Sequence, residues 1–165
     1  MVGCILSMSG RSDEPTPVPT EVPRLWTPRE ANERISDLGE LLPQLKVWAG
    51  RLRQVRAELA RLADFWGEEL LATDHVDHEQ KSRLEREDAN LSSRLEEAVG
   101  ALRSEGIEVK DLSTGLVDFY ALEGGEVVLL CWRVGETEVG YFHTLTGGFA
   151  GRRPLPSRSI SPAPD

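Results

Sequence analysis

Four side chains in the C-terminal third of the chain combine an acid, an imidazole and two guanidinium groups. They are Asp118, His143, Arg133 and Arg152, and Trp132 is placed to form an apolar wall beside them. Such a set can bind an anion or move a proton, because guanidinium groups pair with carboxylates and phosphates and an Asp–His pair exchanges protons. A structural interpretation competes with this one: a diagonal cross-strand ion pair between Asp118 and Arg133, Arg152 pinning the tail, and His143 at the edge of the core.

A second group of potential ligands lies in residues 74–79. Asp74, His75 and His78 offer carboxylate and imidazole ligands of the types that zinc accepts. The same composition is typical of a turn followed by a helix N-terminus, where acidic residues complement the helix dipole. We therefore expect no metal and no cofactor, and keep a metal ion at these three residues as the alternative.

The two cysteines indicate no disulfide framework. Cys4 lies in an N-terminal tail, whereas Cys131 lies inside the apolar run LLCWR and is most simply a buried small residue. No phosphate-binding glycine loop, nucleophile elbow or dinucleotide fingerprint is present in the sequence.

The elements that would position these side chains begin with helices. Thr27-Pro28 followed by Glu30 is a capping box, and Pro43 is expected to break or kink the helix, which gives a short N-terminal helix. Two heptad seams follow, which predict a long antiparallel helical hairpin with Asp88 on the seam, paired to Arg61 or Arg86. The seams are Leu45, Trp48, Leu52, Val55, Leu59, Leu62 and Trp66, and then Leu84, Asp88, Leu91, Leu95, Ala98 and Leu102.

After Gly106 the pattern changes to the period of two that is typical of strands. We expect strands at 107–112, 116–122, 127–133 and 139–144, and hence a small antiparallel sheet of three to four strands. A two-residue loop at Gly124-Gly125 would place Phe119 opposite Leu130 and Val117 opposite Trp132. The fold class is therefore α+β, a helical hairpin followed by this sheet.

The turn after the third strand decides which face of the sheet carries His143. A loop centred on Gly135-Glu136 puts His143 on the face of Val117, opposite Asp118, whereas a one-residue bulge there would move it to the face of Asp118. Both faces are rich in apolar residues. The tail from Gly147 to Leu155 is expected to wrap over the sheet, anchored by Phe149.

Composition limits the classes of partner. The formal net charge is −9 and the sequence pI is about 4.9, which argues against nucleic acid and against an anionic membrane surface. No segment resembles a signal peptide or a membrane span, so we expect a cytoplasmic protein. We expect a disordered tail at 1–24, one domain at 25–155 (helical over 25–105, sheet and tail over 106–155) and a second disordered tail at 156–165.

Three C-terminal blocks carry a family resemblance: VKDLSTGLVDF, LLCWRVGE and YFHTLTGGFAGRRPL. Together with the preceding leucine-rich hairpin and its TPREAN start, they resemble a bacterial family catalogued as domain of unknown function 2203, over roughly residues 25–155. The resemblance implies no particular activity. The matching positions are Asp111, Gly115, Asp118, Phe119, Trp132, Arg133, His143, Phe149, Gly151 and Arg152.

These observations predict a non-enzymatic interaction module. A single hairpin covers only one face of a sheet, so a second apolar face would be buried by a second copy in a homodimer or by another protein. The alternative is a small-ligand (anion or metal) binding protein or an enzyme, with its site at Asp118, His143 and Arg152.

Overall fold

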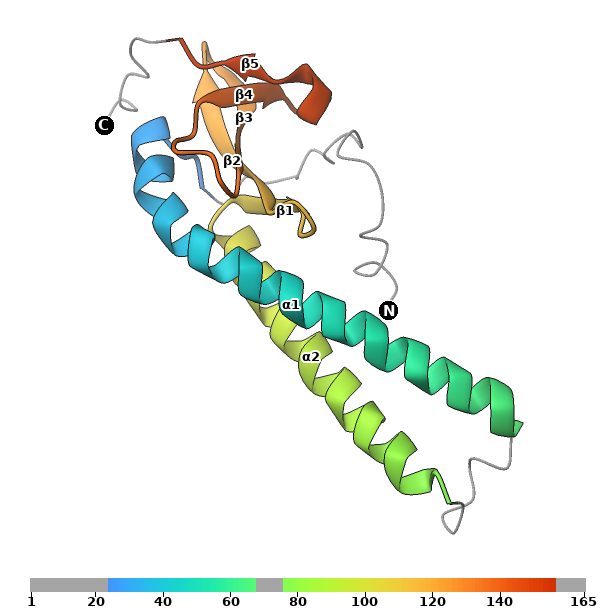
Figure 1. Ribbon diagram of the computed structural model, residues 1–165. Coiled ribbons are helices and arrows are strands. Elements are labelled where there is room, and N and C mark those ends of the chain that lie inside the picture. Colours follow the sequence, from blue (N-terminus) through green and yellow to red (C-terminus); the bar gives the residue numbers. More distant parts are fainter. Residues whose placement is uncertain (1–23, 68–75, 157–165) are drawn as a thin grey trace. The chain divides into compact units, whose positions relative to one another are not determined.

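The computed structural model describes residues 24–67 and 76–156 (Figure 1). It confirms the α+β class, with helices that precede an antiparallel sheet. The tails expected at 1–24 and 156–165 lie outside the described residues, apart from Arg24 and Pro156. The elements are α1 (Pro28–Trp66), α2 (His78–Ser104), β1 (Ile107–Asp111), β2 (Leu116–Glu123), β3 (Glu126–Arg133), β4 (Tyr141–Thr144), the 3-10 turn η2 (Phe149–Gly151) and β5 (Arg153–Pro154).

The chain divides into two compact units. The sheet unit comprises residues up to 43 and from 99 onward, and the hairpin unit comprises residues 44–98. Both long helices run through this division, so each helix contributes to both units.

Helix α1 begins at the predicted capping box. Glu30 Oε2 accepts a hydrogen bond from the Thr27 backbone N–H at 2.8 Å, and Thr27 Oγ1 accepts one from the Glu30 N–H at 3.2 Å. The prediction of a short first helix ending at Pro43 is wrong, because α1 continues through Pro43. The proline is exposed while Leu42 and Leu45 are fully buried, and burying such side chains at about 1.5–3 kcal/mol each offsets the roughly 3 kcal/mol cost of an internal proline.

In the hairpin unit α1 and α2 are antiparallel neighbours (Figure 1). The Arg94 guanidinium stacks on the Trp48 ring at 4.0 Å. Trp48 lies near the beginning of the α1 segment of this unit, and Arg94 lies near the end of its α2 segment. At the opposite end Trp66 Nε1 donates a hydrogen bond to Asp77 Oδ2 at 2.6 Å. The seam is buried at Leu52 and Val55, so the heptad pattern identified its interface correctly.

Asp88, the acidic residue on the seam, pairs with neither of the two arginines that we expected. Asp88 pairs with Arg56, whose Nη2 also donates to Ser92 Oγ at 2.9 Å, and not with Arg61 or Arg86. Arg56 lies on the neighbouring helix, and its long side chain covers the carboxylate across the interface. A polar contact of this kind on a seam favours one register of the two helices.

The sheet is a five-stranded antiparallel meander in the order β1-β2-β3-β4-β5 (Figure 1). The expectation of three to four strands missed β5, whose Arg153 pairs with Phe142 of β4. Residues 153 and 154 of the tail thus extend the sheet edge. The strand expected at 139–144 begins at Tyr141, because the Val139 N–H donates to Asn32 Oδ1 of α1 at 2.8 Å and is lost to the ladder.

The first hairpin of the sheet has the predicted register. Glu123 pairs with Glu126 around Gly124 and Gly125, whose φ angles of 60° and 86° are those of a type I′ turn. Phe119 faces Leu130 and Val117 faces Trp132, as expected.

The second turn decides the faces, and our first assignment for it was wrong. His143 pairs with Leu129, and Tyr141 pairs with Cys131, which itself lies opposite Asp118. This is the one-residue shift that the sequence left open, and it places His143 on the face of Asp118.

Both faces of the central strands are buried in the sheet unit. Val117, Phe119 and Leu130 on one face and Tyr120 and Leu129 on the other are at most 2% exposed. The idea that a second face of the sheet awaits a partner is therefore not supported by this burial. The large apolar side chains that are exposed lie mostly outside these central strands.

Candidate functional site

Three central strands bring Asp118, Cys131 and His143 together on one face of the sheet. Asp118 lies on β2, Cys131 opposite it on β3, and His143 on β4, two residue pairs further along. One potential ligand atom from each residue lies within 4.8 Å of the other two. All three are at most 2% exposed, so the cluster lies in the core of the sheet unit.

The hydrogen bonds of His143 determine where its protons are. Nδ1 lies 2.8 Å from the Thr144 carbonyl oxygen, which can only accept, so Nδ1 carries a proton. Nε2 lies 3.2 Å from Asp118 Oδ2, and two lone pairs would face each other there unless a proton or a cation lies between them. The other carboxylate oxygen, Asp118 Oδ1, is buried without a hydrogen-bond partner among the described residues.

Burial and charge act in opposite directions on His143. Burial alone would lower the pKa of its imidazole, but the hydrogen bond to Asp118 and the charge of that carboxylate outweigh burial and raise the pKa above its ordinary value. Burial also raises the pKa of the Cys131 thiol, and the Asp118 carboxylate adds to this. Cys131 is a buried free cysteine.

Arg152 belongs to a separate ion pair with Glu136. Nη1 and Nη2 donate to the two Glu136 carboxylate oxygens, each at 2.9 Å, and Nη2 also donates to the Cys131 carbonyl oxygen at 3.2 Å. The guanidinium stacks between the rings of Tyr141 at 4.4 Å and Phe149 at 4.7 Å. The Arg152 charge is thus paired with Glu136, and most of its N–H groups donate hydrogen bonds within the chain. Its Nε is buried without a partner among the described residues.

The remaining two predicted site residues point elsewhere. Trp132 pairs with Val117 on the opposite face of the sheet, so it cannot be a wall beside Asp118, and its Nε1 donates to the Glu136 carbonyl oxygen at 3.0 Å. Arg133 is exposed and makes no ion pair with Asp118, whose partner is His143. The diagonal pair that we expected between Asp118 and Arg133 is therefore wrong.

Sequence reasoning missed two members of these clusters. Cys131 was assigned only a packing role, although its position opposite Asp118 follows from the hairpin register that was predicted correctly. Glu136 was placed in a turn, and no local pattern connects it with Arg152, which lies sixteen positions later along the chain. Only the return of the tail along β4 brings the two together.

Of the ligands predicted within residues 74–79, the structure describes only His78. Asp74 and His75 lie outside the described residues. His78 is the first residue of α2, and its Nδ1 is buried without a hydrogen-bond partner among the described residues.

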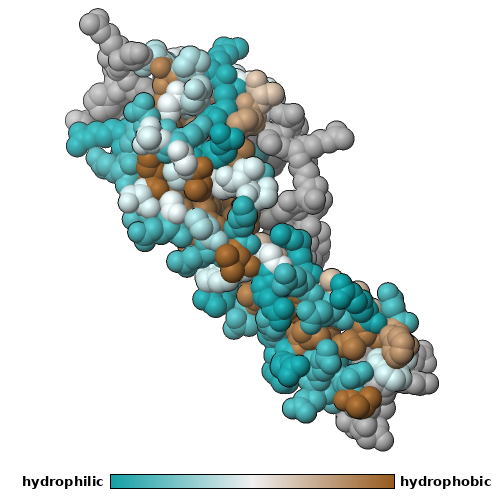
Figure 2. All heavy atoms as spheres, in the orientation of Figure 1, coloured by the Kyte–Doolittle hydropathy of each residue, from teal (hydrophilic) through white to brown (hydrophobic). Residues whose placement is uncertain are grey.

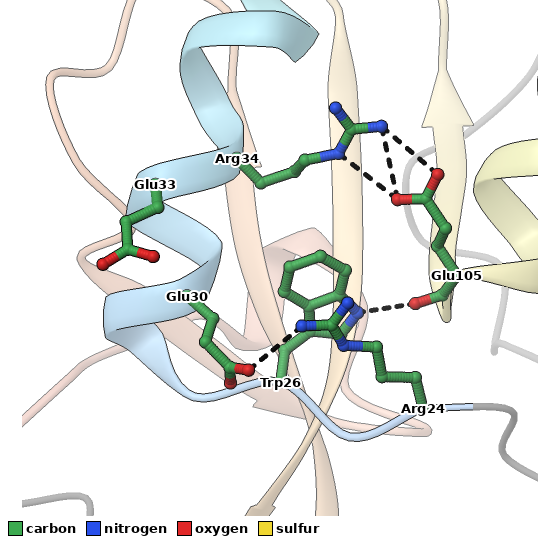
Figure 3. Close-up of a pocket in the computed structure, with 6 residues that line it drawn as sticks. All are labelled: Arg24, Trp26, Glu30, Glu33, Arg34 and Glu105. Carbon is green, nitrogen blue, oxygen red and sulfur yellow. Dashed lines mark hydrogen bonds and ion pairs between the residues drawn. The ribbon is translucent and has the colours of Figure 1, made fainter.

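A shallow surface pocket of about 360 Å³ lies at the start of α1 (Figure 3). Its guanidinium groups are already paired: Arg24 with Glu30 at 3.0 Å, and Arg34 with Glu105 at 3.2 Å. Trp26 forms its floor and donates from Nε1 to the Glu105 carbonyl oxygen at 2.7 Å. Since three carboxylates line the pocket against two guanidinium groups, these side chains tie the N-terminal segment to the end of α2 and do not form an anion site.

Comparison with known proteins agrees with the resemblance in the C-terminal blocks. No curated protein and no solved structure matches the chain significantly. Among the described residues, no helix is both long enough and apolar enough to cross a membrane. The family model described as uncharacterized conserved protein (DUF2203) matches residues 24–155, most of the chain, and the protein belongs to this family.

Proposed function

We propose that this protein is a non-enzymatic interaction module of the cytoplasm, and that its hairpin unit is an antiparallel coiled coil whose tip joins two copies into a homodimer. The observation that carries the proposal is the exposure of large apolar side chains at that tip. Phe65 is 76% exposed and Val76 is 80% exposed, one at the end of α1 and one just before α2. Exposed apolar groups that lie together mark sites of association.

The tip also has a hollow that an apolar side chain can enter. A pocket of about 410 Å³ is lined by Leu62, Phe65 and Trp66 and has charged and polar residues on its rim. Phe65 and Trp66 meet edge to face with their ring centroids 4.7 Å apart. Figure 2 shows brown, hydrophobic side chains among teal ones towards this end of the hairpin. Aromatic residues in such pockets are the usual anchors of protein interfaces.

The charges on the rim favour a second copy of the chain as the occupant. Arg61 and Glu58 both line the pocket, and among the described residues Glu58 pairs with Arg51 at the long distance of 3.6 Å. In a twofold contact, each surface meets an identical surface, so Arg61 of one copy can face Glu58 of the other. A contact limited to the tip buries less area than a standard interface, and we therefore expect a dimer that depends on concentration.

The contacts give less support to a protein that binds an anion, or to an enzyme, at Asp118, His143 and Arg152. Arg152 is already paired with Glu136, and the other two side chains are buried in the core. No described side chain of this group combines a free charge with access to solvent.

Sedimentation velocity over a range of concentrations tests the proposal. We expect the wild-type protein to shift from monomer to dimer below roughly 100 µM, which corresponds to about −5.5 kcal/mol of association free energy. Phe65→Ser should remove the dimer. Val47→Ser is the matched control, because Val47 is 68% exposed on the same helix but lies eighteen residues away from Phe65.

A charge exchange tests the occupant. Arg61→Glu should weaken the dimer, and the double variant Arg61→Glu with Glu58→Arg should restore it if the two residues meet across a twofold axis. A wild-type protein that stays monomeric over the whole range would disprove self-association. A dimer that persists in Phe65→Ser would show that the tip is not the interface.

A further inference from the structure

We infer that Asp118, Cys131 and His143 form a binding site for one divalent metal ion of the zinc type in the interior of the sheet unit. The three residues supply a carboxylate, a thiolate and an imidazole. Zinc binds all three ligand types, whereas hard cations prefer oxygen ligands alone. The site is separate from the proposed interface at the hairpin tip.

The spacing of the three groups suits a small ion. Zinc binds nitrogen and oxygen at about 2.0–2.1 Å, and two ligands of a tetrahedral ion are then about 3.3 Å apart. His143 Nε2 and Asp118 Oδ2 are separated by 3.2 Å, and the ligand atoms of all three residues lie within 4.8 Å of one another. Small side-chain rotations therefore suffice to bring the sulfur into the first coordination sphere.

His143 has the second hydrogen bond that a metal ligand normally has. Metal-binding histidines donate their other ring N–H to a carbonyl or carboxylate, which fixes the tautomer and aims the lone pair at the ion. Here Nδ1 donates to the Thr144 carbonyl oxygen at 2.8 Å, and Nε2 is directed at the Asp118 carboxylate, where the ion would replace the shared proton.

Asp118 provides an independent indication. Asp118 is 1% exposed, and its Oδ1 has no hydrogen-bond partner among the described residues. An unpaired buried carboxylate oxygen is costly, and a bound ion would supply the partner that it lacks. If both oxygens bind, the three residues supply four donor atoms to the ion.

The charges balance with and without the ion. A protonated thiol, a carboxylate and an imidazolium sum to zero. Binding of one M²⁺ displaces the thiol proton and the proton shared by Asp118 and His143, which leaves two anionic ligands, one neutral ligand and the dication, again with zero net charge. The buried cluster thus accepts the ion without adding net charge to the core.

The test uses the full-length chain with Cys4→Ser, so that Cys131 is the only thiol. The protein is unfolded with a chelator present, refolded with one equivalent of Co²⁺ or Zn²⁺, and examined by absorption spectroscopy, native mass spectrometry and thermal unfolding. We expect one ion per chain, a thiolate-to-cobalt charge-transfer band, tetrahedral cobalt bands, and a Tm about 5 °C or more higher with Zn²⁺ than with chelator.

Variants assign the ligands. His143→Gln and Asp118→Asn keep the thiol and nearly the same side-chain volumes, and each should weaken metal binding at least roughly tenfold. His78→Gln should bind as the reference chain does, because His78 lies in the hairpin unit. Far-UV circular dichroism confirms that each variant is folded.

Two results would overturn the inference. A folded reference chain that takes up neither ion would show that a proton alone occupies the space between Asp118 and His143. Binding that survives in His143→Gln but is lost in His78→Gln would place the ion at the hairpin tip.

Discussion

The two units of this protein use the same kinds of charged side chain in different surroundings. In the sheet unit, Asp118 and His143 pair at 1% and 2% side-chain exposure. In the hairpin unit, Arg56 and Asp88 pair at 33% and 26% exposure. Removing one partner of a buried pair leaves a polar group that water cannot reach, whereas water replaces a lost partner at the surface. We therefore expect burial to decide most of what such a pair contributes to stability.

The largest effect should follow from Asp118→Ala. Measured with a chelator present, this variant should lose about 3–5 kcal/mol of the free energy of unfolding, because His143 remains buried without its partner. Denaturant unfolding measures the change. Asp64→Ala, at an exposed position, is the control and should change stability by less than about 0.5 kcal/mol. A loss below about 1 kcal/mol for Asp118→Ala would contradict the role of burial.

The next largest effect should follow from Arg152→Ala. The variant loses two hydrogen bonds to Glu136 and two aromatic contacts. Its free energy of unfolding should therefore fall by about 2 kcal/mol. Arg153→Ala removes the neighbouring, exposed charge and should have little effect. Equal losses in the two variants, measured by thermal unfolding, would show that the pair with Glu136 contributes nothing specific.

The same ion pair should respond to acid. Burial alone would raise the pKa of Glu136, but the hydrogen bonds from Arg152 and from the Arg133 N–H lower it below 4.5. A carboxyl group with a lowered pKa in the folded state stabilises the protein above its unfolded pKa, and this stabilisation is lost as the pH falls through the folded value. The stability difference between wild type and Glu136→Gln should therefore shrink between about pH 6 and about pH 3. A difference that grows over this range would contradict the assignment.

A smaller effect is expected in the hairpin unit. Arg56→Ala breaks the partly exposed pair with Asp88 and the hydrogen bond to Ser92, and should cost about 0.5–1 kcal/mol. The loss should diminish in high salt, because mobile ions screen a pair that solvent reaches. A cost as large as that of Asp118→Ala would remove the contrast between the two units.

The smallest effect should come from Arg29→Ala. Its pair with Glu33 is 89% and 66% exposed, so removing it should cause no measurable change in unfolding. A clear loss of stability in this variant would mean that surface pairs on α1 contribute more than their exposure indicates.

Local patterns predicted most of the secondary structure. The capping box at Thr27 and Glu30, the heptad seam around Leu52 and Val55, and the glycine turn at 124–125 are each set by interactions over a few residues. Pro43 was misjudged because its local cost is offset by the burial of neighbouring leucines, which the local sequence does not show.

The candidate site was predicted only in part. The sequence identified Asp118 and His143 and left open whether they share a face, because one residue in a turn reverses every side chain of the following strand. It also grouped Arg152 with them, whereas the structure pairs Arg152 with Glu136. The partner of a long side chain depends on how the strands are arranged around it, so residue types alone did not separate the two clusters.

The sequence by itself determined the α+β class, the helical hairpin, the register of the first β-hairpin and the chemical types near the end of the chain. Only the tertiary structure decided that His143 meets Asp118 beside Cys131, that a fifth strand extends the sheet, and that both faces of the central strands are buried. The reason is physical. Helix caps, seams and turns depend on neighbours within a few residues, whereas strand register across a turn and the partner of a charged side chain depend on segments that folding brings together.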